Sequence, residues 1–258
     1  MSVKPDLSKS DLSKLKLSVS QFAERFRGDM IPLGTTFSYY CAATPWGAED
    51  LREYLEEPIS ALPPAVASLL PKISILLVPY ISKSKPTDIV SMEKPPEDKL
   101  AFTTQLKVGS ETVLAFGLKG QEVAEYHYRF YNQIATLVAD RTMKPGSPEL
   151  DLPPFLALLR DELSGQIHGE VDEESWRAKQ QIVRRAGKLR TDGKPFWTYA
   201  RNSFIDTLTL YLHGICCDID VDAGPRQLPS RFLRKRLLVL REFFPPPAGF
   251  AVLPEDMK

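Results

Sequence analysis

The chain has 258 residues, of which 43% are hydrophobic and 26% are charged. This mixture is ordinary for a globular protein and excludes a wholly disordered chain, a collagen-like repeat and a disulfide scaffold. Lysine plus arginine and aspartate plus glutamate both number 33, so the formal net charge is zero. The chain as a whole therefore carries no charge that would attract nucleic acid or an anionic membrane, and any such partner would need a local patch.

The N-terminal region and the cysteines predict where the protein resides. Residues 1–18 contain no apolar signal segment, and no apolar stretch approaches the roughly 18 residues that a membrane-spanning helix needs. The three cysteines, Cys41, Cys216 and Cys217, are an odd number without a CxxC pair, and adjacent cysteines seldom form a disulfide. These features predict reduced thiols, no membrane span and a cytoplasmic location.

Proline is unusually frequent, with 22 residues against 14 glycines. The prolines gather at four places, residues 58–79, 86–96, 145–154 and 245–247. Because proline lacks a backbone donor and restrains the residue before it, such clusters end helices and strands. We expect an N-terminal helical region with a small sheet over residues 1–144 and a C-terminal helical region over residues 145–258, which can pack together as one domain.

The first region is predicted to contain both helices and strands. Helices are indicated where apolar residues recur every three or four positions, and strands where short β-branched or alternating runs occur. In chain order we predict an amphipathic helix over residues 11–30, a short helix over 48–56, a buried strand over 72–80, a polar loop over 82–99, a hairpin of 100–108 with 112–119 around a three-residue loop, and a helix over 121–143.

The second region is predicted to be entirely helical. Asp172 resembles a helix N-cap, since two glutamates follow it in the first turn. The predicted helices cover residues 154–167, 173–189, 196–215 and 230–243. The fold class is therefore α+β, with a small antiparallel sheet of about three strands and a covering helix, together with N-terminal helices and a C-terminal helical bundle.

No standard catalytic signature occurs: the sequence contains no HExxH, GxSxG, P-loop or dinucleotide-binding motif. The three histidines, His127, His168 and His213, fall on or at the end of three different predicted helices. Together with Asp206 or Asp161 they are candidate ligands of a metal ion, zinc in the first instance. The alternatives are a structural role for a partly buried His127 and a favourable position of His168 at a helix C-terminus.

Polar residues form one lane along the predicted helix 196–215. They are spaced four, four, three and four positions apart, as Thr198, Asn202, Asp206, Thr209 and His213. Three interpretations are open: the lane is the solvent-exposed face (the wet face) of a peripheral helix, or it forms a buried hydrogen-bonded network, or it lines a pocket. Arg201 flanks it and is a candidate anion contact.

Cys216 and Cys217 follow the lane directly. A thiol close to His213 is a candidate nucleophile or metal ligand, while the apolar neighbour Ile215 favours inert buried thiols. Three aspartates alternate over residues 218–222, but the glycine and terminal glutamate of the known calcium loop are absent, so a solvated loop is expected.

The last predicted helix is amphipathic and basic. Its cationic residues include Arg231, Arg234, Lys235 and Arg236, which are candidate contacts for an anion or a partner. The alternative is a helix docked on the core with a solvated basic face.

Three functional hypotheses follow. The first is a non-catalytic binding or interaction module with a protein partner, since no catalytic signature is present. The second is a metal-assisted hydrolase-like enzyme that uses His127, His168 and His213 with an aspartate. The third is nucleic-acid binding through the last helix.

Overall fold

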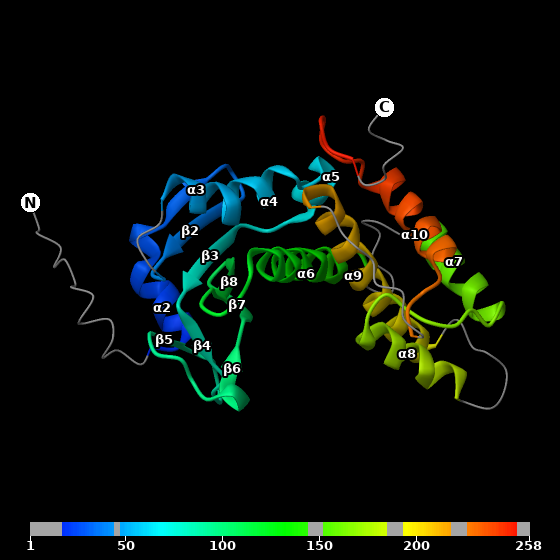
Figure 1. Ribbon diagram of the computed structural model, residues 1–258, viewed down its shortest axis with the longest axis horizontal. Helices are drawn as coiled ribbons and strands as arrows, with labels where there is room; N and C mark the ends of the chain where they lie inside the picture. The colour runs from blue at the N-terminus through cyan, green and yellow to red at the C-terminus, as the bar shows by residue number, and fades with distance from the viewer. Residues whose placement is uncertain (1–16, 44–46, 144–151, 185–192, 218–225, 252–258) are drawn as a thin grey trace, which may run out of the picture. The chain divides into compact units, whose positions relative to one another are not determined.

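The computed structural model of the protein describes residues 17–43, 47–143, 152–184, 193–217 and 226–251 (Figure 1). Two compact units are present, one built from residues 1–56 with 71–126 and the other from 57–70 with 127–258. The division falls inside helix α6 (Val123–Thr142), after Tyr126, whereas the proline cluster indicated a division near residue 145. The expected mixture of helix and strand is confirmed.

The first unit contains all eight strands that the described residues form. Its elements are α2 (Val19–Phe26), β1 (Ile31–Leu33), β2 (Phe37–Cys41), α3 (Ala48–Leu51), β3 (Ile73–Val78), β4 (Tyr80–Ser82), β5 (Ile89–Ser91), β6 (Leu100–Ala101), β7 (Thr103–Val108) and β8 (Glu111–Gly117). A π-helical stretch, Arg52–Glu56, continues α3.

The sheet prediction is confirmed in part: a three-stranded antiparallel sheet is present, but the predicted strands 72–80 and 112–119 lie in a separate, larger sheet that is partly parallel. One sheet has five strands in the order β1-β2-β3-β8-β7, and β3 lies parallel to both β2 and β8. A second, antiparallel sheet of three strands has the order β5-β4-β6, and β5 lies in the stretch that was predicted to be a loop. All six residues of β3 are buried, as is typical of a central parallel strand, and this explains its unbroken apolar run.

The hairpin prediction is confirmed, but its loop is shorter than expected. Val108 pairs with Glu111, so the loop has two residues and not three. Gly109 has a φ of 62°, in the left-handed region that glycine adopts without strain.

Helix α2 covers one face of the five-stranded sheet. Ser18 accepts a hydrogen bond from the Gln21 backbone N–H and forms a capping box with it. The buried face of the helix joins one apolar cluster with strand residues, whose members include Phe22, Phe26, Leu76, Val113 and Ala115. Residues 11–16 of the predicted helix lie outside the described residues. Leu17 and Ser18 are not helical, and the described helix begins at Val19.

The second unit is helical. It contains α4 (Glu57–Ser60), α5 (Pro64–Leu69), the greater part of α6, α7 (Pro153–Ser164), α8 (Glu173–Val183), α9 (Lys194–Cys216) and α10 (Ser230–Phe243). Helix α9 packs against α8 and α10, and α10 also packs against α7 (Figure 1). Asp172 is the N-cap of α8, as predicted, and α10 has the predicted bounds. Helix α7 ends at Ser164, three residues earlier than expected.

No helix within the described residues is both long and apolar enough to cross a bilayer.

Candidate metal centre

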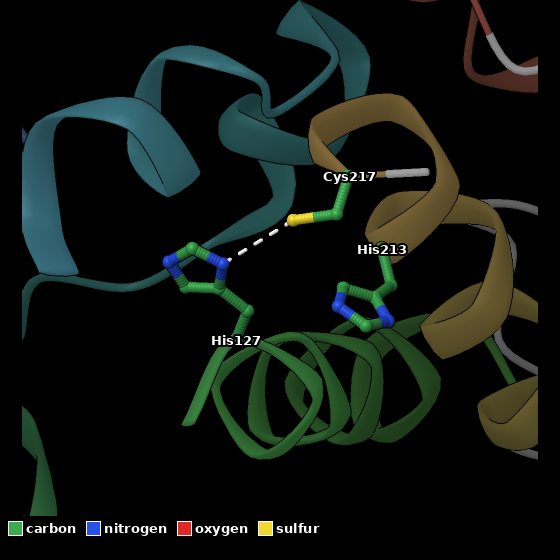
Figure 2. Close-up of side chains that lie close together, drawn as sticks. All are labelled: His127, His213 and Cys217. Atoms are coloured by element: carbon green, nitrogen blue, oxygen red, sulfur yellow. Dashed lines mark hydrogen bonds between the residues drawn. The ribbon is translucent and has the colours of Figure 1, made fainter. Parts of the chain in front are cut away.

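Two of the three histidines converge with a cysteine inside the second unit. His127 lies on α6, while His213 lies in the last turns of α9 and Cys217 caps that helix. One ligand atom from each of these residues lies within 4.8 Å of the other two, and His127 Nδ1 is 3.3 Å from Cys217 Sγ. Figure 2 shows one ring nitrogen of His213 turned toward the other two side chains. The three side chains thus enclose one point from two helices.

The spacing of the two α9 ligands follows from helix geometry. Residues four apart lie on the same side of a helix, and His213 and Cys217 have this spacing. The Cys217 backbone N–H donates to the His213 carbonyl at 2.8 Å, which holds the last turn closed. A histidine followed four positions later by a cysteine at a helix end is a signal that the sequence carried, although we predicted His168 as the third ligand.

The His213 imidazole has a buried nitrogen, Nε2, without a hydrogen-bond partner in the described part of the chain. Burial, and secondarily the charge of His127, lower the pKa of His213 below its ordinary value. The imidazole is therefore neutral at pH 7 and offers a lone pair, the form in which histidine binds metals.

Tyr131 lies one turn after His127 on α6 and borders the site. Its hydroxyl donates to the Pro58 carbonyl at 3.1 Å, and its ring centroid is 6.1 Å from that of His213. The neighbouring side chains of Cys217 and, secondarily, Tyr131 outweigh the effect of burial and lower the pKa of Cys216 to about 7. Cys216 and Cys217 are both half-buried, and the inertness of their thiols stays a prediction.

The remaining predicted ligands lie elsewhere. His168 lies between α7 and α8, where it lines a pocket of about 520 Å³ together with Lys179 and Val183. Neither His168 nor Asp206 belongs to the group of close ligand atoms around His127. The expected convergence of all three histidines with Asp206 is therefore wrong for two of the four residues. His168 lies outside the group because it follows the end of α7, close to the bridge between Glu170 and Gln227. Asp206 lies about two turns before His213 on α9, too far along the helix to reach the same point.

The polar lane of α9 passes from solvent into the core. Thr198 is exposed and Asn202 half-buried, whereas Asp206 and Thr209 are buried. Asn132 Nδ2 donates to Thr209 Oγ1 at 3.4 Å. The wet-face alternative therefore applies only to the beginning of the lane. Arg201, the flanking candidate for an anion, forms an ion pair with Asp140 at 2.7 Å.

Asp206 is a buried carboxyl group. It is 5% exposed, and its Oδ2 has no partner within the described parts of the chain. Burial raises its pKa to about 7, hydrogen bonds from Ser175 oppose this, and the nearby charges of Asp172 and Glu174 add to it.

We expect Asp206 to make stability depend on pH. The folded state holds a proton that the unfolded state loses between about pH 4 and pH 7, so the free energy of unfolding falls as the pH rises through this window. Asp206→Asn removes the ionisable group. Between pH 5 and pH 8 its free energy of unfolding should exceed that of the wild type by roughly 2–4 kcal/mol. Urea unfolding at several pH values measures this. Asp161→Asn, at an exposed position of α7, is the control, and equal pH profiles of Asp206→Asn and wild type would contradict the assignment.

A buried ionic network joins four helices of the second unit through Glu170, which lies between α7 and α8. Arg236 of α10 is fully buried, and its guanidinium donates to Glu162 of α7 and to Glu170 Oε2 at 2.8 Å. Lys179 of α8 donates to Glu170 Oε1 at 3.0 Å, and Tyr199 of α9 donates to the same oxygen at 2.6 Å. Burial alone would raise the pKa of Glu170, but the ion pairs and hydrogen bonds lower it to about 2.

This network corrects the prediction for Arg236. We expected it to contact an anion or partner beside Arg231, Arg234 and Lys235, yet those three are exposed and Arg236 is 0% exposed. Arg236 lies three residues after Leu233 and four before Leu240, both buried, so it belongs to the core-facing side of the helix. Arg231 and Lys235 lie over the ring of Phe232. The partner and nucleic-acid contacts of the exposed three residues stay predictions.

Comparisons with known proteins found no matching protein-family model, no matching curated protein and no matching solved structure.

Proposed function

We propose that the protein is a zinc-binding protein in which His127, His213 and Cys217 hold the ion and thereby tie α6 to the end of α9. The observation that carries the proposal is the buried, unpartnered Nε2 of His213 beside a thiol and a second imidazole. A buried polar atom without a partner calls for an ion or a water, and a metal ion satisfies all three groups at once.

The donor set fits zinc in chemistry and in size. Imidazole nitrogen and thiolate sulfur are its usual protein ligands. Zinc–nitrogen and zinc–sulfur bonds of about 2.0–2.3 Å place ligand atoms of a tetrahedral site roughly 3.3–3.8 Å apart. His127 Nδ1 and Cys217 Sγ already have such a separation, at 3.3 Å. The three ligand atoms lie within 4.8 Å of one another, so only a small movement of the side chains is needed to bring all three to bonding distance of one ion.

Zinc binding of this kind is compatible with the expected non-catalytic module. Helix α6 and the end of α9 are distant in sequence, so an ion held by both stabilises the folded state over the unfolded chain. Hydrolase-like chemistry would additionally need a water on the ion and a general base beside it. It stays a prediction, as does nucleic-acid binding.

The expected result is one equivalent of zinc per chain. His127→Ala, His213→Ala and Cys217→Ser should each weaken zinc binding by about 100-fold or more, since each removes one of few ligands. Competition with a chromophoric chelator measures the affinity, and thermal unfolding with zinc or with EDTA measures the coupled stability.

The chain offers matched controls for these variants. His168→Ala changes a histidine outside the site, and Cys41→Ser a cysteine of β2. Both should bind zinc within about twofold of the wild type. If zinc binding is absent, or unchanged in all three ligand variants, the proposal fails. In that case rapid, His127-dependent alkylation of Cys217 would instead identify the 3.3 Å pair as a nucleophile with its base.

A further inference from the structure

The pocket that His168 lines lies inside the second unit, between the end of α7 and the last turns of α8. It is separate from the candidate metal centre, because none of its lining residues belongs to the group around His127. Its volume is about 520 Å³, and small-molecule sites in proteins have volumes of roughly 300–1,000 Å³. The pocket is therefore large enough for a small organic ligand.

A buried ammonium group lies in the wall of this pocket. Lys179 is 3% exposed, and its Nζ donates to the Gly169 carbonyl at 2.9 Å and to Glu170 Oε1 at 3.0 Å. A lysine ammonium has three N–H groups, so one of them has no acceptor among the described residues. Because an unpaired donor is costly away from water, this N–H calls for an acceptor atom in the pocket.

The charges around the pocket favour a neutral acceptor. The buried network is already balanced, since the carboxylates of Glu162 and Glu170 face two cations, Arg236 and Lys179. A carboxylate or phosphate of a ligand beside Lys179 would add an uncompensated negative charge. The pocket also lies at the C-terminal ends of α7 and α8, where the helix dipole disfavours anions. A carbonyl oxygen accepts from Lys179 without adding charge.

Amide and apolar side chains complete the lining. Gln166 and Gln180 line the pocket, and a carboxamide can donate to and accept from another amide at the same time. Ile167 and Val183 line it as well, and Val183 is 56% exposed, which is unusual for a large apolar side chain. The lining therefore suits a ligand that combines an amide with an apolar body.

The backbone of Gln166 adopts a conformation that costs stability. Its φ is 53°, in the left-handed region that glycine usually occupies at the end of a helix. Its N–H donates to the Leu163 carbonyl at 3.1 Å and thereby closes the end of α7, which glycine would do without strain. Stability alone would thus favour glycine here, whereas a ligand in the pocket gives the glutamine side chain a role.

We infer that this pocket binds a small neutral amide with an apolar body, whose carbonyl oxygen accepts the third N–H of Lys179 and whose amide group bonds with the side chains of Gln166 and Gln180. The apolar body then covers Ile167 and Val183. This site goes beyond the proposed zinc site and does not depend on it.

Four probes that share a benzene ring test the chemistry of the ligand. Binding of benzamide, benzoate, benzylamine and toluene to the full chain is measured by ligand-observed NMR. Benzamide should bind with a Kd of about 1 mM or below, and about tenfold or more tightly than each of the others. Benzoate that binds as tightly as benzamide would overturn the neutral acceptor, and toluene that does so would overturn any role of Lys179. Absence of benzamide binding would overturn the inference as a whole.

Variants of the pocket wall locate the bound probe. Gln166→Gly should weaken benzamide binding by about threefold or more, yet should unfold at a temperature no lower than the wild type because the backbone strain is relieved. Val183→Asp should weaken binding by about fivefold or more. Ile31→Asp is the matched control, since Ile31 is 52% exposed and lies on β1 of the first unit, and it should bind benzamide like the wild type. If Gln166→Gly and Val183→Asp also bind like the wild type, benzamide binds elsewhere and the inference is wrong.

Discussion

Replacement of Arg236 by methionine should destabilise the second unit by about 3–5 kcal/mol. Arg236 is fully buried, and its removal leaves the carboxylates of Glu162 and Glu170 with Lys179 as their remaining cation in the network. An uncompensated buried charge is costly because the interior cannot solvate it. Denaturant unfolding followed by tryptophan fluorescence measures the change, since Trp176 and Trp197 both lie in this unit.

A second substitution separates charge from volume. Glu162→Gln in the Arg236→Met background restores neutrality, because Glu170 and Lys179 then balance each other. The double variant should therefore be more stable than Arg236→Met alone, by about 1–2 kcal/mol. Arg231→Met, an exposed position on the same helix, is the control and should change stability by less than about 0.5 kcal/mol. A double variant less stable than Arg236→Met would show that lost packing, and not unpaired charge, dominates.

Gly169→Ala should destabilise the same unit by about 3 kcal/mol or more. Gly169 has a φ of 82°, and a Cβ at this position would lie 2.1 Å from the Gln227 carbonyl oxygen. The obstructing atom is backbone and cannot rotate away. The strand-like bridge between Glu170 and Gln227 would have to open, with loss of the bonds from Glu170 N–H to the Arg226 carbonyl and from Leu228 N–H to the Glu170 carbonyl.

Two other glycines isolate the steric part of this effect. Gly120 and Gly249 have φ values of 81° and 89°, and a Cβ at either would meet nothing within 4 Å. Alanine at these positions should lower stability only through the left-handed backbone conformation, by about 1–2 kcal/mol. If Gly169→Ala is no more destabilising than Gly120→Ala, the prediction is wrong: the backbone at Gln227 then moves away from the added Cβ without loss of stability and does not fix the position of Glu170.

Local sequence signals predicted many elements of this fold. The helix 230–243, the Asp172 cap and the hairpin each depend on residues close in sequence, whose preferences act within one or two turns. The five-stranded sheet was not predicted because β2 and β8 become neighbours of β3 only through parallel pairing, which links distant segments and leaves no local pattern.

The candidate site shows the same division. The sequence by itself identified His127 and His213 as possible ligands and a thiol close to His213 as a candidate ligand or nucleophile. The spacing of Arg236 from Leu233 and Leu240 also indicates a buried position, although we predicted an exposed contact. Only the tertiary structure decided that α6 faces the end of α9, so that Cys217 and not His168 joins the two imidazoles. Helical periodicity fixes the direction of a side chain about its own axis, but the positions of two helices in space are set by the packing of all the apolar faces together.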